Sequence, residues 1–225
     1  MKLYGSLASP FVARCWLAAA AKGSNVDLEL YEDGIKSDSY LAMNPMGKMP
    51  LLVDGDVALP ESTVICEYLD ETLPGPALMP SDPGGKAKVR LLTHIADLYL
   101  SGPSSQLSRA APDDDAEQIA AAVAAADAGF TYLEHFIGGN GRAYGDSLTL
   151  ADCTLQPSVN FAVLVLAKHG AKDKLDGHPK LSRWWKGCVE NPSLKDAIGQ
   201  IDEAVLAFRK RRAEEAAKKA ATEAK

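Results

Sequence analysis

The sequence has 225 residues, a length that suits one large domain or two small ones. Apolar residues make up 47% and charged residues 24%, as in an ordinary soluble globular protein, and the net charge is -6. This negative charge argues against a nucleic-acid partner, which usually selects a basic surface. We find no stretch near the roughly 20 apolar residues of a membrane helix, so no membrane partner is expected.

The beginning of the chain and the cysteines both bear on the compartment. Residues 1–5 lack the long apolar core of a signal peptide and are typical of a strand, so we expect a cytoplasmic protein. No two of the four cysteines have Cys-x-x-Cys spacing: Cys15, Cys66, Cys153 and Cys188. We interpret them as buried free thiols in a reducing compartment.

The first part of the chain alternates strand and helix patterns. A brief strand around Leu3 precedes an alanine-rich helix over 11–21, and the alternating residues 26–30 predict a half-buried strand. Two further strands flank the turn 54–56, and a helix starts at Pro60. This order predicts a sheet of mixed direction with helices on its faces, an α/β domain.

The second part is predicted to be all-α. Four prolines within ten residues, followed by Gly84-Gly85, mark a linker at 77–85 between a domain over 1–76 and a helical domain over 86–212. Helical patterns cover 86–107, 116–137, 150–169, 179–189 and 194–208. Breaks are expected at Pro112-Asp113, 138–141, Gly170 and Asn191-Pro192. The charged residues 213–225 offer no apolar stripe, so we expect a solvated, frayed tail.

Two places in the first domain combine residues that carry chemistry. Ser9-Pro10-Phe11 stands at a strand-to-helix turn, and Lys48-Met49-Pro50 is followed by Pro60-Glu61-Ser62 at the start of another helix. Taken singly, Ser9 would be a helix cap, and the Glu-Ser pair would suit the helix macrodipole.

The spacing of these motifs resembles the glutathione transferase family over nearly the whole chain. The resemblance includes Arg14, Lys36, Asn44-Pro45, the run 61–69 and the helix-capping segment 147–152. It implies a thioredoxin-like N-terminal domain followed by an all-α C-terminal domain. In disulfide-reducing relatives the first turn carries Cys-Pro-x-Cys, whereas this chain has Ser-Pro-Phe-Val over 9–12, similar to the serine motif of tau-class and bacterial members. The chain resembles bacterial members of the tau, phi and zeta types alike.

The resemblance assigns a part of glutathione to each site residue. A cis bond at Met49-Pro50, as in the family, would let the Met49 backbone pair with the cysteinyl part. Lys36 and Lys48 would meet the glycyl carboxylate as point charges. Glu61 would accept the γ-glutamyl ammonium, and Ser62 with the helix N-terminus would bind the γ-glutamyl carboxylate.

Ser9 is the expected catalytic residue, with glutathione as co-substrate. A free thiol has a pKa of about 8.5 and is only a few per cent thiolate at neutral pH. One donated hydrogen bond, worth roughly 1.5–3 kcal/mol, would lower that pKa by about one to two units. The attacking sulfur belongs to glutathione, so Ser9 is not a covalent nucleophile. The four histidines lack metal-ligand spacing, and no metal is expected.

The second substrate is expected to be a hydrophobic electrophile in the cleft between the domains. Its walls would come from 6–8, from Phe11 and from the first long helix, where Tyr99 is a more plausible contact than His94. The alternative is that Tyr99 lies in the core or at an interface. If the family's homodimer forms, Asp97 could reach the neighbouring subunit's glutathione.

Several alternatives stay open at this point. The same thiolate serves conjugation in detoxification, epoxide opening, isomerisation, peroxide reduction and ether cleavage, so a specialised lyase, etherase or isomerase is one alternative. A non-catalytic binding protein of the same fold is another. Cys15 could act in place of Ser9, although its helical position predicts a core residue. A serine hydrolase lacks support, because no histidine lies in a triad motif. We interpret the capping box 149–152 as a folding element.

Overall fold

The computed structural model describes residues 1–110, 115–171 and 175–223. Its sheet has four strands in the order β2-β1-β3-β4, with bounds Lys2–Tyr4 for β1, Asp27–Glu29 for β2, Leu51–Asp54 for β3 and Val57–Pro60 for β4. β1 pairs parallel with β2 and antiparallel with β3, and β3 pairs antiparallel with β4. The predicted sheet of mixed direction is confirmed.

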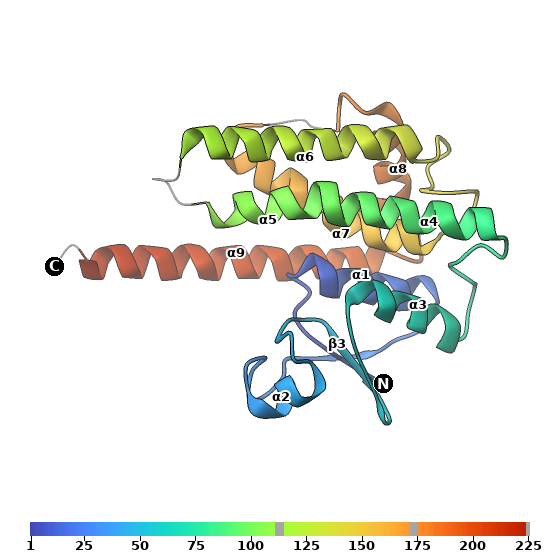
Figure 1. The fold of residues 1–225 in the computed structure, drawn as a ribbon, viewed down its shortest axis with the longest axis horizontal. Coiled ribbons are helices and arrows are strands. Elements are labelled where there is room, and N and C mark those ends of the chain that lie inside the picture. Colours follow the sequence, from blue (N-terminus) through green and yellow to red (C-terminus); the bar gives the residue numbers. More distant parts are fainter. Residues whose placement is uncertain (111–114, 172–174, 224–225) are drawn as a thin grey trace.

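Three helices complete the first domain. They are α1 (Pro10–Ala21), α2 (Asp38–Met43) and α3 (Ser62–Thr72). Proline at its start and Gly23 with a φ of 67° just beyond its end set the limits of α1. α1 packs against α3 and also against α7 of the helical half, so it lies between the sheet and the second domain (Figure 1).

The second half of the described chain is helical, as predicted, and each predicted pattern contains a helix. The bounds are α4 Pro83–Ile95, η1 Ala96–Ser101, α5 Gly102–Arg109, α6 Ala116–Phe136, α7 Leu150–Lys168, α8 Pro179–Val189 and α9 Lys195–Glu223. The first pattern was expected to be one regular helix, but η1 is a π-helical turn between α4 and α5. Pro112-Asp113 lies outside the described residues.

The central helix of this half is α7. By length and composition α7 could cross a membrane, whereas we expected no stretch of that kind from the sequence. In the structure, however, 72% of its apolar window is buried inside the protein. It packs against α1, α4, η1, α5 and α8. Packing on several sides explains its apolar composition, because such a helix needs no polar face. The predicted capping box, Thr149 with Asp152, is present at its start.

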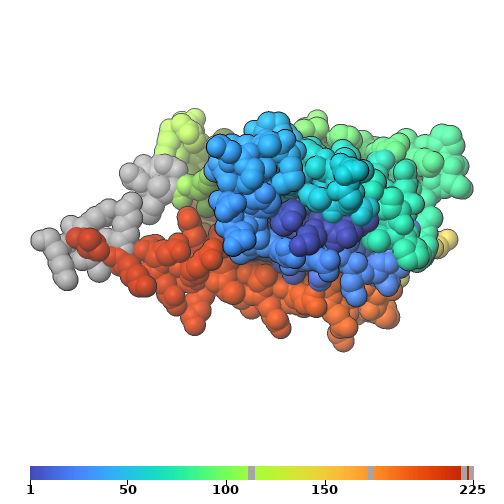
Figure 2. Space-filling view, turned by 90° about the horizontal axis from the view of Figure 1, so that it is seen from below, coloured from blue at the N-terminus to red at the C-terminus, as the bar shows by residue number. Residues whose placement is uncertain are grey.

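α9 is the longest described helix and extends beyond the rest of the molecule (Figures 1 and 2). Its first turns bury Ala197, Ile198 and Ile201, whereas residues 206–218 are exposed. The helix continues through Glu223 without a break at residue 213. Solvation of this end agrees with its composition, and fraying stays a prediction.

Candidate active site

A cavity of about 140 Å³ lies where the start of α1, the loop before β3 and the start of α3 meet. Its lining consists of Phe11, Asn44, Met46, Lys48, Met49, Pro50, Pro60, Glu61 and Ser62. The cavity therefore brings together most of the residues that the sequence predicts to bind glutathione. A larger cavity of about 310 Å³ between α1 and α9 contains none of those residues, and we assign the site to the smaller one.

The loop before β3 is held by two hydrogen bonds to one carbonyl. The Lys48 carbonyl accepts from Tyr40 Oη at 2.6 Å and from Asn44 Nδ2 at 2.7 Å. The Met49-Pro50 peptide is cis, as the resemblance implied. Asn44 is only 1% exposed and also lines the cavity, although the resemblance included Asn44-Pro45 without assigning it a part of glutathione. An asparagine directly before a proline was the available signal, since its side-chain amide can hold a neighbouring carbonyl.

The start of α3 forms the opposite side of the cavity. Glu61 has a φ of 68° and is the one described non-glycine residue with positive φ. Such a left-handed conformation is costly and is often found at ligand sites. The Glu61 side chain makes no capping bond to the helix, so its carboxylate is not engaged by the first turn. Ser62 is 5% exposed at the first helical position, where unpaired backbone N–H groups favour an anion.

Ser9 occupies the position before α1, with extended backbone angles. Its carbonyl accepts from the amides of Val12 and Ala13, but its side chain makes no capping hydrogen bond. The hydroxyl is therefore not engaged in the helix capping that the simpler interpretation assigned to it. Gly5 brings this turn close to the cavity, because a Cβ there would lie 2.5 Å from a Val12 methyl and 3.5 Å from the Met49 Cβ. Ser9 itself is not among the lining residues.

Two other predicted residues also lie outside the lining. Lys36 is exposed, and its Nζ donates to the Gly47 carbonyl at 2.9 Å. Tyr99 is 49% exposed, and its ring packs edge-on against Tyr132 with 5.3 Å between centroids. Their roles in binding glutathione and the electrophile stay predictions.

Cys15 is a poor candidate for the nucleophile. It is fully buried, with its Sγ 3.6 Å from the Ser62 carbonyl and 3.9 Å from the Cys66 Sγ. Burial raises the pKa of the Cys15 thiol well above its ordinary value. A thiol held neutral in the core cannot supply a thiolate near pH 7. Across the described ranges, no three His, Cys, Asp or Glu side chains form a group that could hold a metal ion.

Comparison with known families identifies both halves of the chain. The profile of the glutathione S-transferase N-terminal domain matches residues 3–77, and that of the glutathione S-transferase C-terminal domain matches residues 116–186. The chain belongs to the glutathione S-transferase family.

Relatives within this family include isomerases. The maleylacetoacetate isomerase of Rattus norvegicus is 34% identical over 70% of this chain and 76% of its own length. That of Pseudomonas aeruginosa is 31% identical over 88% of this chain and 95% of its own. The holo structure of a maleyl pyruvate isomerase, a bacterial zeta-class glutathione S-transferase, is 29% identical with a TM-score of 0.69, covering 88% of this chain and 96% of that one.

Proposed function

We propose that this protein binds glutathione in the cavity beside Ser9, stabilises its thiolate and adds it to a hydrophobic electrophile. The observation that carries the proposal is the cavity itself. It combines a lysine, a glutamate free of helix capping and the N-terminus of a helix within about 140 Å³. This set of charges matches a peptide that carries two carboxylates and one ammonium group.

Each part of glutathione has a partner in this arrangement. Lys48 attracts the glycyl carboxylate. Lys36 also binds this carboxylate once its Nζ gives up the hydrogen bond to the Gly47 carbonyl. Glu61 accepts the γ-glutamyl ammonium. Ser62 and the backbone N–H groups of α3 bind the γ-glutamyl carboxylate. The Met49 backbone pairs with the cysteinyl part like an added strand.

Ser9 lowers the pKa of the bound thiol. Its hydroxyl makes no capping bond, so it can donate to the sulfur instead. A hydrogen bond to a charged acceptor contributes roughly 1.5–3 kcal/mol, which corresponds to about one to two pKa units. The positive end of α1 acts in the same direction. Together these effects make the thiolate a major species near pH 7.

Replacement of Ser9 tests this mechanism. We expect Ser9→Ala to lower turnover at pH 7 by about 10- to 100-fold and to raise the pKa of the bound thiol, with little change in glutathione affinity. Ser9→Thr, which keeps the hydroxyl, should retain most of the activity. Ultraviolet titration of bound glutathione and assays with an activated aryl chloride measure both effects. Unchanged turnover in Ser9→Ala would remove Ser9 from the mechanism.

Isomerisation is the second candidate reaction, because relatives up to 34% identical are maleylacetoacetate isomerases. The same thiolate would add to a conjugated double bond. Rotation about the resulting single bond and loss of the thiolate would then return glutathione unchanged. Side-by-side assays with an aryl chloride and with maleylacetoacetate separate the two reactions. Retention on glutathione resin without turnover of either compound would indicate a non-catalytic binding protein.

The electrophile is expected against Phe11, which lines the cavity and belongs to α1, the helix that packs against α7 of the helical half. Tyr99 is the weaker candidate for this contact, since its ring packs on Tyr132 and half of it is exposed.

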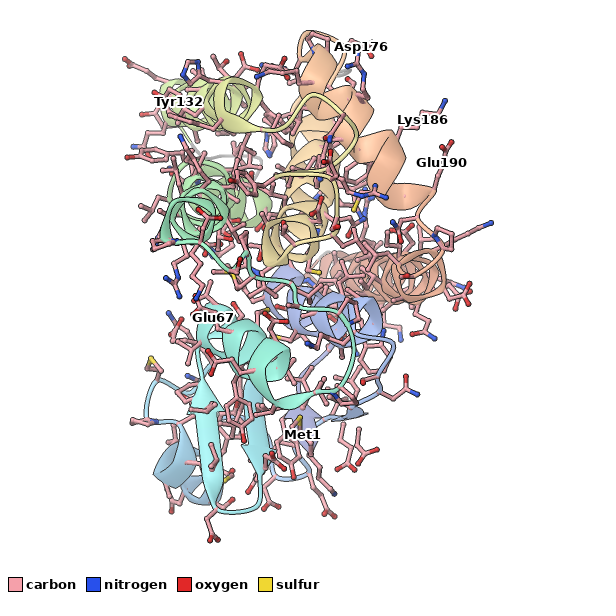
Figure 3. All side chains as sticks on the ribbon, turned by 90° about the vertical axis from the view of Figure 1, so that its right-hand side faces the viewer. Met1, Glu67, Tyr132, Asp176, Lys186 and Glu190 are labelled. Carbon is pink, nitrogen blue, oxygen red and sulfur yellow. The ribbon has the colours of Figure 1, made fainter. Side chains whose placement is uncertain are left out.

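A second copy of this chain is the proposed partner. Large exposed apolar side chains gather on η1 and α6: Leu98 at 64%, Tyr99 at 49%, Tyr132 at 44% and Phe136 at 41%. In Figure 3, Tyr132 lies on the outer side of its helix, on the same side of the molecule as Glu67 of α3. A patch of this kind is typical of an interaction surface.

A further inference from the structure

An ion pair between a fully buried arginine and a partly exposed aspartate joins the two domains close to the cavity. Arg14 of α1 is fully buried, and its Nη1 and Nη2 donate to the two carboxylate oxygens of Asp97 in η1 at 3.0 and 2.6 Å. Nη2 also donates to the Ser158 hydroxyl of α7 at 3.2 Å. One guanidinium thus connects the first domain with two elements of the helical half.

The same guanidinium supports the wall of the cavity. Its Cζ lies 5.0 Å from the centre of the Phe11 ring, and Phe11 lines the cavity. Phe11 is two residues from Ser9, in the first turn of α1. A cation at this distance attracts an aromatic face and so favours the observed position of the ring. The position of Phe11 therefore depends on where Asp97 and Ser158 hold Arg14.

The backbone around Asp97 departs from a regular helix. Asp97 belongs to the π-helical turn η1, and its side chain is 25% exposed while that of Arg14 is fully buried. π-helical turns are rare and occur frequently at functional sites. This irregular turn carries the carboxylate that binds the guanidinium.

Stability alone does not require this pair. Removing two charges from water is costly, and well-packed apolar side chains often replace a buried ion pair without loss of stability. A second ion pair with two hydrogen bonds also connects the domains, but it lies at the surface. Arg90 of α4 donates to both oxygens of Glu67 in α3 at 2.8 Å, but these side chains are 52% and 37% exposed and do not line the cavity.

We infer that Arg14 is a positioning residue. Held by Asp97 and Ser158, it fixes Phe11 and the first turn of α1 against the helical half, so that the thiolate beside Ser9 and the electrophile meet in one geometry. This inference rests on the proposed glutathione chemistry and adds a residue that determines how the electrophile is placed. The residues proposed to hold glutathione itself lie in the loop before β3 and at the start of α3, whereas the guanidinium bonds to η1 and α7.

Arg14→Lys tests the role without removing the charge. Lysine cannot reproduce the planar, two-bond geometry or the contact with the Phe11 ring. Since small displacements of reacting groups cost about 10- to 100-fold in rate, we expect kcat/KM for an activated aryl chloride to fall by about that factor. The KM for glutathione should change less than about threefold. Circular dichroism and thermal melting give the folded fraction, to which the rates are normalised.

Arg90→Lys is the matched control, because it makes the same chemical change in the exposed pair. It should leave both kinetic constants within about twofold of the wild type. Asp97→Asn should reproduce the Arg14→Lys profile, and the double variant should lose little more than either single one, since both changes break one contact.

The outcomes distinguish this inference from the proposed function. An active wild type with an equally active Arg14→Lys variant would overturn the positioning role alone. So would a loss shared equally by Arg90→Lys, or one fully accounted for by unfolded protein. A wild type that turns over no electrophile with glutathione would overturn the proposed function and this role together.

Discussion

A single buried carboxylate, that of Asp152, holds three parts of the helical domain together. Its Oδ1 accepts from the Ala143 amide at 2.8 Å and from Trp184 Nε1 at 2.9 Å. Its Oδ2 accepts from the amide and the hydroxyl of Thr149 at 2.8 and 2.9 Å. Burial raises the pKa of Asp152, although these hydrogen bonds favour the charged form. The residue therefore does more than cap α7.

Asp152→Ala is expected to cost about 3 kcal/mol or more of unfolding free energy. It would leave buried donors of Ala143, Thr149 and Trp184 without partners, and each such donor costs about 1–3 kcal/mol. Asp82→Ala is the control, because that exposed cap of α4 accepts one bond, from the Gly85 amide, and should cost only about 1 kcal/mol. Urea denaturation measures both. Equal losses would show that Asp152 acts only as a cap.

The predictability of single residues from the sequence depended on local context. Ser9, Lys48 and Glu61 stand in short runs whose spacing resembles a known family, so the sequence could propose them as site residues; Lys48 and Glu61 line the cavity, and the role of Ser9 stays a prediction. The partner of Arg14 was not, because Asp97 lies 83 residues away and no local pattern connects the two. An arginine within an alanine-rich helix was the one available signal, since burial of its charge requires a partner.

At the scale of elements, hydrophobic periodicity predicted every strand of the sheet and the main described helices. It did not predict η1, because a π-helical turn changes the spacing by a single residue and leaves the apolar pattern almost intact. It also did not determine how far α9 continues. Charged and alanine-rich residues have high helix propensity, yet they bury nothing that would fix an end.

The exposed part of α9 is expected to be dispensable for folding. A chain ending at Phe208 should keep its unfolding free energy within about 0.5 kcal/mol, because the removed side chains that are described are exposed. A chain ending at Leu194 should unfold, since it loses Ala197, Ile198 and Ile201 from the core. Urea denaturation and circular dichroism measure both truncations. A large loss of unfolding free energy in the chain that ends at Phe208 would show that the end of α9 packs against something in solution.

At the scale of the whole molecule, α1 is the common element. It packs against α3 of its own domain and against α7 and α9 of the helical half; Ser9 directly precedes it and Phe11 lies in its first turn. The cavity forms where three separate segments meet, so hydrophobic patterns alone could not place its residues together. The family resemblance supplied that arrangement, and the structure adds the bonds that hold it.

The exposed apolar patch on η1 and α6 predicts that the whole molecule forms a dimer. A stable interface usually buries about 800 Å² on each partner, and the apolar side chains of η1 and α6 offer its centre. A charge placed there would be desolvated without a partner. We therefore expect Tyr132→Glu and Phe136→Glu to convert a dimer at micromolar concentration into monomers by sedimentation analysis.

The control for this prediction is Leu206→Glu, since Leu206 is 65% exposed on α9, outside the patch. It should leave the dimer intact, because it changes surface charge without entering the interface. The cavity is formed by one chain, so monomers of Tyr132→Glu should still be retained on glutathione resin. A wild type that sediments as a monomer would contradict the proposed dimer. A dimer that survives both glutamate substitutions would place the interface on another face.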